Sequence, residues 1–453
     1  MFQMSSSRVG VVVLGDMARS PRMKYHALSL LSHGFSVDMV GYQSSPLPQS
    51  ILSRAKVRCL PPVPGAVSSL PRLLSYLVKT VWQAVTLLLT LPLLSHLDYL
   101  LVQTPPGVPT LPVLAVYCWV KGTRLVVDWH NYSHSILALS LSQSHHLVRL
   151  TRWLENTAAT MASSAFCVTK VKVHPILTTI LKDFQAMQYD LKTNWGIEAQ
   201  VLYDKPPARF RPITSQEKGD LLRRLSTDYP VLGEVTPSTG IIVSSTSWTE
   251  DEDFGVLLSA LILYETRKEA EDGLPELLVV ITGKGPQKKY YLERISSLSL
   301  RHVKIVTPWL DLEDYPLIVA SADLGICLHT SSSGLDLPMK VVDMFGCRLP
   351  VAAIEFPALS ELVKDGVNGH VFTTSDQLSE IIANWFRNFP DLHDKKFKEN
   401  IDEFRSIGWD DNWDNIALKV FSEKSVKSVS GFVYYAFFIC LFCVFSSFLP
   451  TVQ

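Results

Sequence analysis

Short apolar runs of strand length alternate with stretches of helix length along nearly the whole chain of 453 residues. The apolar runs are continuous and do not alternate with polar residues, which is typical of strands buried on both faces of a parallel sheet. The series restarts near the middle of the chain, so the sequence predicts an α/β fold with two doubly wound, Rossmann-like domains. The predicted strands are residues 9–15, 35–41, 99–104, 125–129 and 165–169, and then 240–244, 277–282, 303–306, 324–329 and 351–354. The predicted helices include residues 21–32, 147–161, 254–265, 286–295 and 338–345.

Shifts in composition suggest where these domains begin and end. The first predicted domain covers residues 1–204, and the stretch 205–239, with its prolines and charges, has linker composition. The second domain is predicted at 240–389 and is followed by helices at 390–428. Because ligands of doubly wound sheets bind at the carboxyl ends of the strands, we expect substrate sites to face a cleft between the two domains.

Two segments raise the question of a membrane. Residues 431–449 are uncharged and apolar over nearly the length of a transmembrane helix, with basic residues before them and none after them. We interpret this segment as a C-terminal anchor that leaves the preceding chain in the cytosol, with a buried C-terminal helix as the alternative. Residues 78–94 are also very apolar, and they fit either a helix lying on a bilayer or a plain core helix.

Charge and cysteine content exclude several classes of protein. The chain has 42 basic and 43 acidic side chains, so no broad basic surface is expected to bind nucleic acid. Its seven cysteines are odd in number and lack the paired spacing of a structural zinc site. These features indicate a reduced protein that faces the cytosol.

Polar residues follow two predicted strands of the first domain. Asp16 ends the first strand and could take a proton from an attacking hydroxyl, while Arg19 and Arg22 could hold an anionic group of an acceptor. The alternative is that Asp16 caps the helix that begins near residue 21. A second group, Trp129, His130 and Asn131, closes another strand, where His130 could exchange a proton and Trp129 could stack on a sugar. A core histidine is the alternative there.

In the second domain, the acidic run 249–253 suggests a metal site at first sight. However, Thr249 and Glu252 have the spacing of a capping box before the helix from residue 254, so no metal is predicted. Gly283, Lys284 and Gly285 follow a strand and could contact a diphosphate, although a tight turn also explains the glycines. The candidate ligand-binding residues of this domain, which would bind the donor if the protein transfers a group, are Ser245, Ser247, Gly283, Lys284, Gly285, His329, Ser333, Gly334, Leu335, Asp336, Lys340 and Asp343.

Five sequence blocks resemble the chitobiosyldiphosphodolichol β-mannosyltransferases, glycosyltransferase family 33. The resemblance extends from about residue 9 to residue 413. The blocks are Gly-Asp-x-x-Arg-Ser-Pro-Arg-Met from Gly15, Asp-Trp-His-Asn-Tyr from Asp128, Tyr-Asp-Lys-Pro from Tyr203, Ser-Ser-Thr-Ser-Trp-Thr-Glu-Asp-Glu-Asp from Ser244, and residues 334–346.

The resemblance implies a GT-B fold and the transfer of mannose from GDP-mannose to GlcNAc2-diphosphate-dolichol, with inversion to a β-1,4 linkage. This reaction takes place on the cytosolic face of the endoplasmic reticulum membrane, beside other early dolichol-pathway mannosyltransferases, and supplies protein N-glycosylation. GDP-mannose is then a substrate, with no tightly bound cofactor and no divalent cation expected. A related enzyme that uses another nucleotide sugar is the alternative within the same class.

The resemblance also assigns roles to individual residues. It places Asp343 at the position that binds the ribose, and Lys284 and Lys340 replace the basic residues that often neutralise the donor diphosphate. The base that deprotonates the acceptor in inverting relatives often follows the first strand, so we rank Asp16 first and His130 second. One departure from the family pattern is an insert at residues 171–185, which keeps open the alternative of a catalytically impaired variant or a non-catalytic scaffold.

Overall fold

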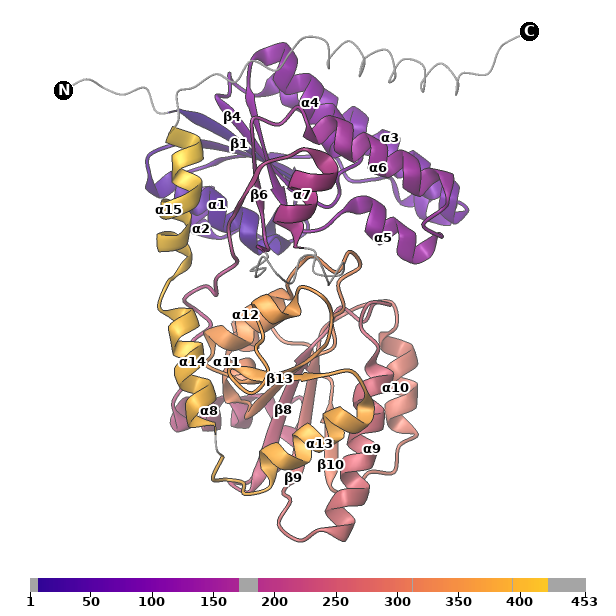
Figure 1. The fold of residues 1–453 in the computed structure, drawn as a ribbon, viewed down its shortest axis with the longest axis vertical. Coiled ribbons are helices and arrows are strands. Elements are labelled where there is room, and N and C mark those ends of the chain that lie inside the picture. The colour runs from indigo at the N-terminus through magenta and orange to yellow at the C-terminus, as the bar shows by residue number, and fades with distance from the viewer. Residues whose placement is uncertain (1–6, 171–185, 312, 393, 423–453) are drawn as a thin grey trace, which may run out of the picture. The chain divides into compact units, whose positions relative to one another are not determined.

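The computed structural model of the chain describes residues 7–170, 186–311, 313–392 and 394–422, which form two compact units (Figure 1). The first unit contains the chain up to Cys167, the segment Asp190–Leu202 and the chain from Trp413 onward. The second unit contains Val168–Tyr189 and Tyr203–Asn412. The predicted anchor at 431–449 lies outside the described residues.

A parallel seven-stranded sheet forms the centre of the first unit. Consecutive residues of the first strand, such as Val11 and Val12, are both fully buried, so packed side chains cover both faces of the sheet. In spatial order the strands are β3 (Lys56–Cys59), β2 (Ser36–Tyr42), β1 (Arg8–Asp16), β4 (Tyr99–Thr104), β5 (Arg124–Trp129), β6 (Ser164–Cys167) and β7 (Ala199–Val201).

Helices connect these strands, and the last helix returns to them from the far end of the sequence. Trp413, in that last helix, is fully buried, and its indole Nε1 donates a hydrogen bond to Nδ1 of His26 at 3.0 Å. The helices are α1 (Pro21–Ser32), α2 (Gln49–Leu52), α3 (Arg72–Thr90), α4 (Thr110–Lys121), α5 (Ser133–Ser140), α6 (His146–Ala159), α7 (Met187–Trp195) and α15 (Trp409–Ser422).

The second unit is built around a parallel six-stranded sheet. Neighbouring residues of its central strand belong to different core clusters, because Val243 packs on one face of the sheet and Ile242 on the other. In spatial order the strands are β10 (Val303–Val306), β9 (Glu276–Thr282), β8 (Thr239–Ser245), β11 (Leu324–Cys327), β12 (Val351–Ile354) and β13 (Gly369–Phe372). The helices are α8 (Ser215–Leu225), α9 (Phe254–Ala270), α10 (Lys288–Ser296), α11 (Asp314–Ser321), α12 (Met339–Gly346), α13 (Ser375–Phe386) and α14 (Lys395–Arg405).

The prediction of two doubly wound α/β sheets is confirmed, and each of the ten predicted strands overlaps an observed one. The three strands that the sequence did not predict, β3, β7 and β13, all lie at the edge of a sheet. Three of the four residues of β3 are exposed, so it lacks the continuous apolar run by which the central strands were found.

The predicted linker at 205–239 contains a helix that belongs to the second unit. Thr214 and Glu217 form a reciprocal capping box at the start of α8. Leu221, Leu222 and Leu225 then pack into the core of the second unit. The linker prediction is therefore wrong for α8, because its charged surface conceals an amphipathic pattern.

The insert at 171–185 lies outside the described residues, but the residues on either side of it form the first turn of one helix. Thr169 Oγ1 accepts a hydrogen bond from the backbone N–H of Met187 at 2.9 Å, and the Thr169 carbonyl accepts one from Gln188 N–H at 3.2 Å. If the insert is left out of the count, these are the contacts of a helix N-cap with its third and fourth residues. The described chain therefore has the geometry of an N-capped helix interrupted after its first residue.

Deleting residues 171–185 is expected to leave the second unit folded, because Lys170 and Ala186 would then follow each other in the first turn of α7. A shorter connection also has a smaller closure entropy. The midpoint of thermal unfolding should stay the same or rise by a few degrees. Thr169→Ala in the shortened chain is the matched control, and it should cost about 1 kcal/mol of stability as the loss of an N-cap. A shortened chain that no longer folds would contradict this interpretation.

Candidate active site

Asp16 ends β1 at the carboxyl edge of the first sheet. Its Oδ1 accepts a hydrogen bond from Ala18 N–H at 3.0 Å and so caps the short 3₁₀ helix Met17–Arg19, not the α-helix that follows. Its Oδ2 is buried and has no hydrogen-bond donor among the described residues, with Arg19 Nε at 3.6 Å. Asp16 thus combines a structural cap on one oxygen with a second oxygen that is available to accept a proton.

His130 follows β5 at the same edge. Its Nε2 has no hydrogen-bond partner among the described residues and lies 3.6 Å from Oδ2 of Asp128. Strand β4 lies between β1 and β5 in the sheet, and among the described residues no hydrogen bond or ion pair joins Asp16 to His130. Asp16 and His130 are therefore alternative bases and not two members of one relay.

Asp128 is a fully buried carboxylate at the end of β5, and sequence reasoning missed its role. It accepts two hydrogen bonds from Arg22, at 2.7 and 2.8 Å, and one from His26 Nε2 at 3.1 Å. His26 Nδ1 accepts from Trp413, so the hydrogen of neutral His26 is on Nε2. Burial raises the pKa of Asp128, but Arg22 and the two histidines outweigh it and hold that pKa well below its usual range.

The structure corrects two of the four predicted acceptor contacts. Arg22 is buried, and besides its contacts with Asp128 it donates a hydrogen bond to the Leu202 carbonyl at 2.9 Å. Its guanidinium therefore binds groups in the interior of the first unit. Trp129 is also buried, with its ring edge against Trp195. Neither side chain can reach a ligand. Arg19 is 71% exposed, and partly buried Asn131 accepts a hydrogen bond from Tyr132 N–H at 2.8 Å.

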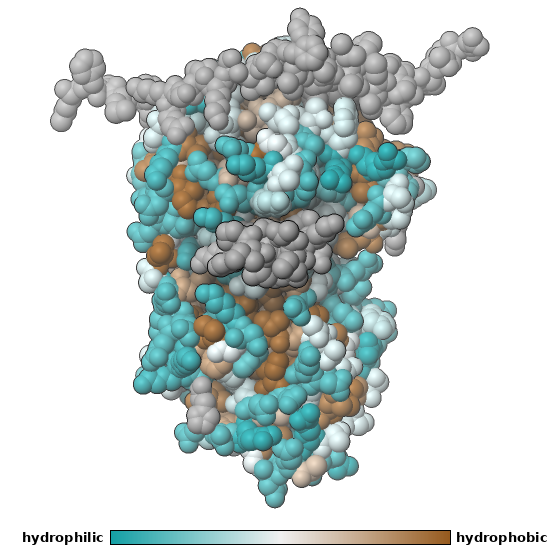
Figure 2. Space-filling model, viewed as in Figure 1, coloured by the Kyte–Doolittle hydropathy of each residue, from teal (hydrophilic) through white to brown (hydrophobic). Residues whose placement is uncertain are grey.

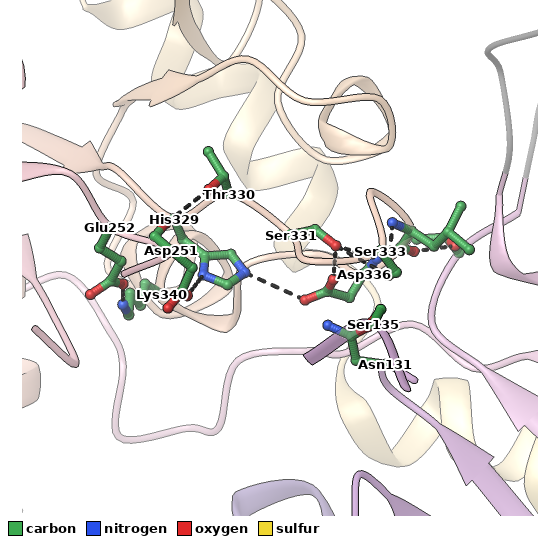
Figure 3. Close-up of polar contacts among 12 residues, drawn as sticks. Asn131, Ser135, Asp251, Glu252, His329, Thr330, Ser331, Ser333, Asp336 and Lys340 are labelled. Carbon is green, nitrogen blue, oxygen red and sulfur yellow. Dashed lines mark hydrogen bonds and ion pairs between the residues drawn. The ribbon is translucent and has the colours of Figure 1, made fainter. Parts of the chain in front are cut away.

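Several predicted donor-binding residues of the second unit lie together at the carboxyl edge of its sheet (Figure 3). The loop after β8 and the loop after β11 are joined there by an isolated antiparallel bridge between Glu252 and His329. This bridge aligns a row of charged and hydroxyl side chains. The row contains Asp251, Glu252, His329, Ser331, Ser333, Asp336 and Lys340.

His329 lies between two carboxylates. Its Nδ1 is 3.0 Å from Asp251 and its Nε2 is 3.4 Å from Asp336. Burial lowers the pKa of His329, but the hydrogen bonds and charges of the two carboxylates outweigh it and raise the pKa to about 9. The hydrogen bond from His329 in turn lowers the pKa of Asp251. His329 is therefore a cation at neutral pH, held in place on both ring nitrogens.

Lys340, in the first turn of α12, forms an ion pair with the buried carboxylate of Glu252. The second oxygen of Glu252 accepts hydrogen bonds from Thr246 Oγ1 at 2.5 Å and from Ser247 N–H at 2.7 Å. Burial lowers the pKa of Lys340 to about 8, although the negative charge of Asp251 acts to raise it. The contacts of Glu252 fix the ammonium group beside the loop after β8.

These contacts correct the predicted capping box. Asp253 is the N-cap of α9, and its side chain accepts from Gly255 N–H at 2.8 Å, so Glu252 is not part of the cap. Asp251, Glu252 and His329 have ligand atoms within 4.8 Å of one another, a spacing that fits a metal ion. However, Lys340 and protonated His329 already supply positive charge to this cluster. The absence of a catalytic cation stays a prediction.

The loop from Ser331 to Asp336 is a tight turn that depends on Gly334. Gly334 has a φ of +75°, in the left-handed region that favours glycine, and its N–H donates to the Ser331 carbonyl at 3.2 Å. Ser333 Oγ accepts from Leu335 N–H at 3.3 Å, and Ser331 Oγ donates to Asp336. Leu335 is buried, so only its backbone takes part in this turn.

Asp343 lies one turn further along α12. Burial raises its pKa to about 7, while the charge of Arg209 and a hydrogen bond from Tyr315 act in the opposite direction. Tyr315 also forms a 2.9 Å hydrogen bond with Ser245 at the end of β8. Tyr315, which the sequence did not single out, therefore connects two of the predicted donor-binding residues.

Gly283 and Gly285 allow the loop after β9 to pack closely against the loop after β8. A Cβ at Gly283 would stand 1.8 Å from the Thr246 carbonyl oxygen, and a Cβ at Gly285 would stand 1.7 Å from that of Ser247. Lys284 is exposed, and its Nζ lies 3.6 Å from the centre of the Trp309 ring. Among the described residues, the hydrogen bonds and ring contacts of these three residues involve Trp248, Lys288 and Trp309, and not the row of charged side chains around His329.

The raised pKa of His329 makes the stability of the second unit dependent on pH. A folded-state pKa of about 9 against an ordinary 6.5 gives a contribution that is complete below pH 6.5 and is lost as the pH rises through 9. Urea unfolding at pH 6.5, 8 and 10 should show this loss, at most about 3 kcal/mol, in the parent chain and not in His329→Asn. Lys340 titrates in the same pH range and changes the stability in the opposite direction. Because it is present in both proteins, its contribution cancels in the difference between their pH profiles. Parallel pH profiles would contradict the assigned contacts.

Comparisons with known proteins show which proteins this chain resembles in sequence and in fold. The family described as "Glycosyl transferases group 1" matches residues 256–404. The chain is 40% identical to "Chitobiosyldiphosphodolichol beta-mannosyltransferase" of Mus musculus, over 92% of this chain and 89% of that one. It is 39% identical to "UDP-glycosyltransferase TURAN" of Arabidopsis thaliana, over 92% and 97%. Its fold is similar to that of Anabaena Alr3699/HepE in complex with UDP-glucose, with a TM-score of 0.64, 16% identity and coverage of 92% and 100%.

Proposed function

The chain belongs to the family of chitobiosyldiphosphodolichol β-mannosyltransferases, and we propose that it transfers mannose from GDP-mannose to dolichol-diphosphate-linked chitobiose with inversion to a β-1,4 linkage. The observation that carries this proposal is the 40% identity, which extends over nearly the full length of both chains. The two doubly wound sheets give the chain the GT-B fold of a glycosyltransferase. The product would be an early intermediate of the lipid-linked oligosaccharide for N-glycosylation.

We assign donor binding to the carboxyl edge of the second sheet. Lys340 and the positive end of the α12 dipole supply positive charge for a diphosphate, since the N-cap Pro338 makes no side-chain cap. Asp343, in the same helix, suits the vicinal hydroxyls of a ribose. The tight turn at Gly334 lets a ligand approach the backbone. These roles follow from charge and position.

We assign proton transfer to the first unit. In an inverting reaction a base removes the proton of the acceptor hydroxyl while its oxygen attacks the anomeric carbon and the bond to GDP breaks. Asp16 is the first candidate because its Oδ2 is buried and has no hydrogen-bond donor among the described residues. The negative charge that develops on GDP is balanced by Lys340 and the dipole of α12, so we expect no divalent cation to be required.

We also propose a location and partners for the protein. A dolichol-linked acceptor is held in a membrane by its hydrocarbon chain, so the enzyme must work at a membrane surface. We place it at the endoplasmic reticulum with both units on the cytosolic side. Other mannosyltransferases that act early on dolichol-linked acceptors are candidate partners.

Calorimetric titration of the full chain tests the donor assignment. GDP-mannose, in excess EDTA, should bind at least about tenfold more tightly than UDP-glucose, which addresses the different donor named for the Arabidopsis relative. Lys340→Met should weaken GDP-mannose binding by about 10- to 100-fold through the loss of a charge-assisted contact. Lys284→Met is the matched control and should have a smaller effect, because Lys284 lies against Trp309. Tighter binding of UDP-glucose, or binding that disappears in EDTA, would contradict the assignment.

A further inference from the structure

Helix α3 has an apolar face on its outer side as well as on its inner side. Toward the interior of the first unit, Thr86 and Leu87 are buried and Trp82 donates a hydrogen bond to the Pro61 carbonyl at 3.2 Å. The opposite side carries five apolar residues at spacings of three or four, each between 45% and 57% exposed. This docking stripe consists of Leu74, Leu77, Val81, Val85 and Leu88.

The docking stripe belongs to a larger set of exposed apolar side chains in the same part of the chain. Of the 21 large apolar side chains that are exposed among the described residues, 13 lie between residues 74 and 153. Figure 2 shows apolar residues at the surface of the first unit on the side where Figure 1 places α3. Trp119 and Val120 at the end of α4, and Trp153 in α6, contribute to this set. Such a concentration of exposed apolar side chains indicates an interaction surface.

The exposed charges of helices α3, α4, α5 and α6 have one sign. Helices α3, α4, α5 and α6 contain a single acidic residue, Glu155, and it is fully buried. Lys79, Lys121, Arg149 and Arg152 in the same helices are exposed. A cationic surface around exposed apolar side chains is complementary to a bilayer that contains anionic lipids.

The fold requires α3 to lie along a surface and not to cross a bilayer. The segment Leu74–Leu93 has a mean hydropathy of 1.4 and the length of a membrane span, but 22% of it is buried within the unit. It also connects β3 to β4, two parallel strands of the same sheet. A helix that crossed the bilayer would place these strands on opposite sides of it. The topology therefore excludes a span for residues 78–94 and leaves a surface helix or a plain core helix, and the exposure of the docking stripe favours the surface helix.

We infer that the docking stripe on α3 inserts into the interfacial layer of an anionic bilayer and holds the first unit on the membrane. This contact is separate from the predicted anchor at 431–449 and does not depend on which sugar is transferred. Because α3 leads into β4, it runs antiparallel to the strands and begins at the edge of the sheet that carries Asp16. If the proposed function holds, that orientation brings the bilayer close to the site where a lipid-linked acceptor is used.

Lipid quenching of a fluorophore on the full chain tests this inference. Cys59→Ser removes the exposed native thiol among the described residues. Val85→Cys then places a nitrobenzoxadiazole label on the docking stripe, and Ile262→Cys places it on α9 of the second unit at a similar exposure of 41%. The same chain without either added cysteine supplies the background. Vesicles of phosphatidylcholine and phosphatidylserine carry a nitroxide near the headgroup end of the acyl chains.

The label at position 85 should be quenched at least about twofold more than the label at position 262, with an emission shift to shorter wavelength. Adding Leu77→Glu, Val81→Glu and Leu88→Glu should abolish the difference, while circular dichroism verifies that the fold is retained. Both labelled proteins keep residues 431–449, so attachment through that segment alone would leave the difference unchanged in the variant with the three added glutamates and would overturn the inference. Equal quenching at the two positions would overturn the inference. A shift at position 85 that appears without vesicles, and rises with protein concentration, would also overturn it by indicating a protein partner.

Discussion

Replacing Asp16 by Asn lowers kcat for mannose transfer by about 10²- to 10⁴-fold and leaves the affinity for GDP-mannose within about twofold. Asn keeps an oxygen that can accept the hydrogen bond from Ala18 N–H, so the cap of the 3₁₀ helix is retained. It replaces Oδ2, the buried oxygen without a hydrogen-bond donor among the described residues, by an amide that cannot accept a proton. The variant therefore removes the proton acceptor and keeps the helix cap, so it tests the two roles of Asp16 separately.

Steady-state kinetics at saturating acceptor, with donor titration calorimetry on the same protein, provide the test of Asp16. His130→Gln is the matched variant at the other candidate base, and it should reduce kcat by less than tenfold. Near-normal turnover in Asp16→Asn, together with a large loss in His130→Gln, would transfer the role of base to His130. A loss of folding in Asp16→Asn would show that the Asp16 carboxylate is required for the stability of the fold as well as for proton transfer.

Replacing Arg22 by Met should destabilise the first unit by about 3 to 5 kcal/mol. Arg22 makes a bidentate ion pair with Asp128 at 2.7 and 2.8 Å, and both side chains are almost fully buried. Removal of the guanidinium leaves a buried carboxylate with a much weaker set of partners, which is the costly way to break such a pair. The loss exceeds that expected from a surface substitution by a wide margin.

Urea unfolding of the full chain measures this loss, with hydrogen exchange of the β1 and β5 amides used to assign the transition to the first unit. Arg19→Met is the matched control, because Arg19 is an exposed arginine in the same motif, and its effect should stay within about 0.5 kcal/mol. The double variant Arg22→Met with Asp128→Leu should recover part of the stability, since it removes both charges. A loss below 1 kcal/mol in Arg22→Met would contradict the role given to this pair.

The architecture was predictable because the central strands of both sheets are buried on both faces. Burial of that kind demands continuous apolar residues, as in β1 and β8, and such runs are visible without a structure. Strand β3 was missed because three of its four residues are exposed, β7 because it has only three residues, and β13 because it begins with Gly369 and His370 and so lacks a continuous apolar run. Helix α8 was missed because its leucines lie among many charged residues and a nearby pair of prolines.

The site was predictable where one loop contains its residues and not where distant segments meet. His329 and Lys340 were found from the loop and helix that follow β11. Of their partners, Glu252 was assigned to a helix cap, because the spacing of Thr249 and Glu252 fits that motif as well, and Asp251 was not singled out within the acidic run. The actual arrangement depends on the bridge between Glu252 and His329, which are 77 positions apart in the sequence.

Arg22 shows the same limit in the first unit. A basic residue in the first turn of a helix after a sheet edge can point to solvent or into the sheet, and the local sequence is the same in both cases. The pairing with Asp128 in β5, more than 100 residues away, decides that it is buried. Only the tertiary structure shows that Arg19 and Arg22, three residues apart, have different surroundings.

The most direct test of the central claim is a transfer assay with radiolabelled GDP-mannose and a phytanyl-diphosphate chitobiose acceptor, using the full chain in detergent micelles. We expect a product extended by one mannose, from which β-mannosidase releases the label and α-mannosidase does not. The chain without residues 171–185 should give the same product. If neither form yields labelled product while GDP-mannose still binds, the chain is a scaffold that retains the donor site, and the account of it as a mannosyltransferase is contradicted.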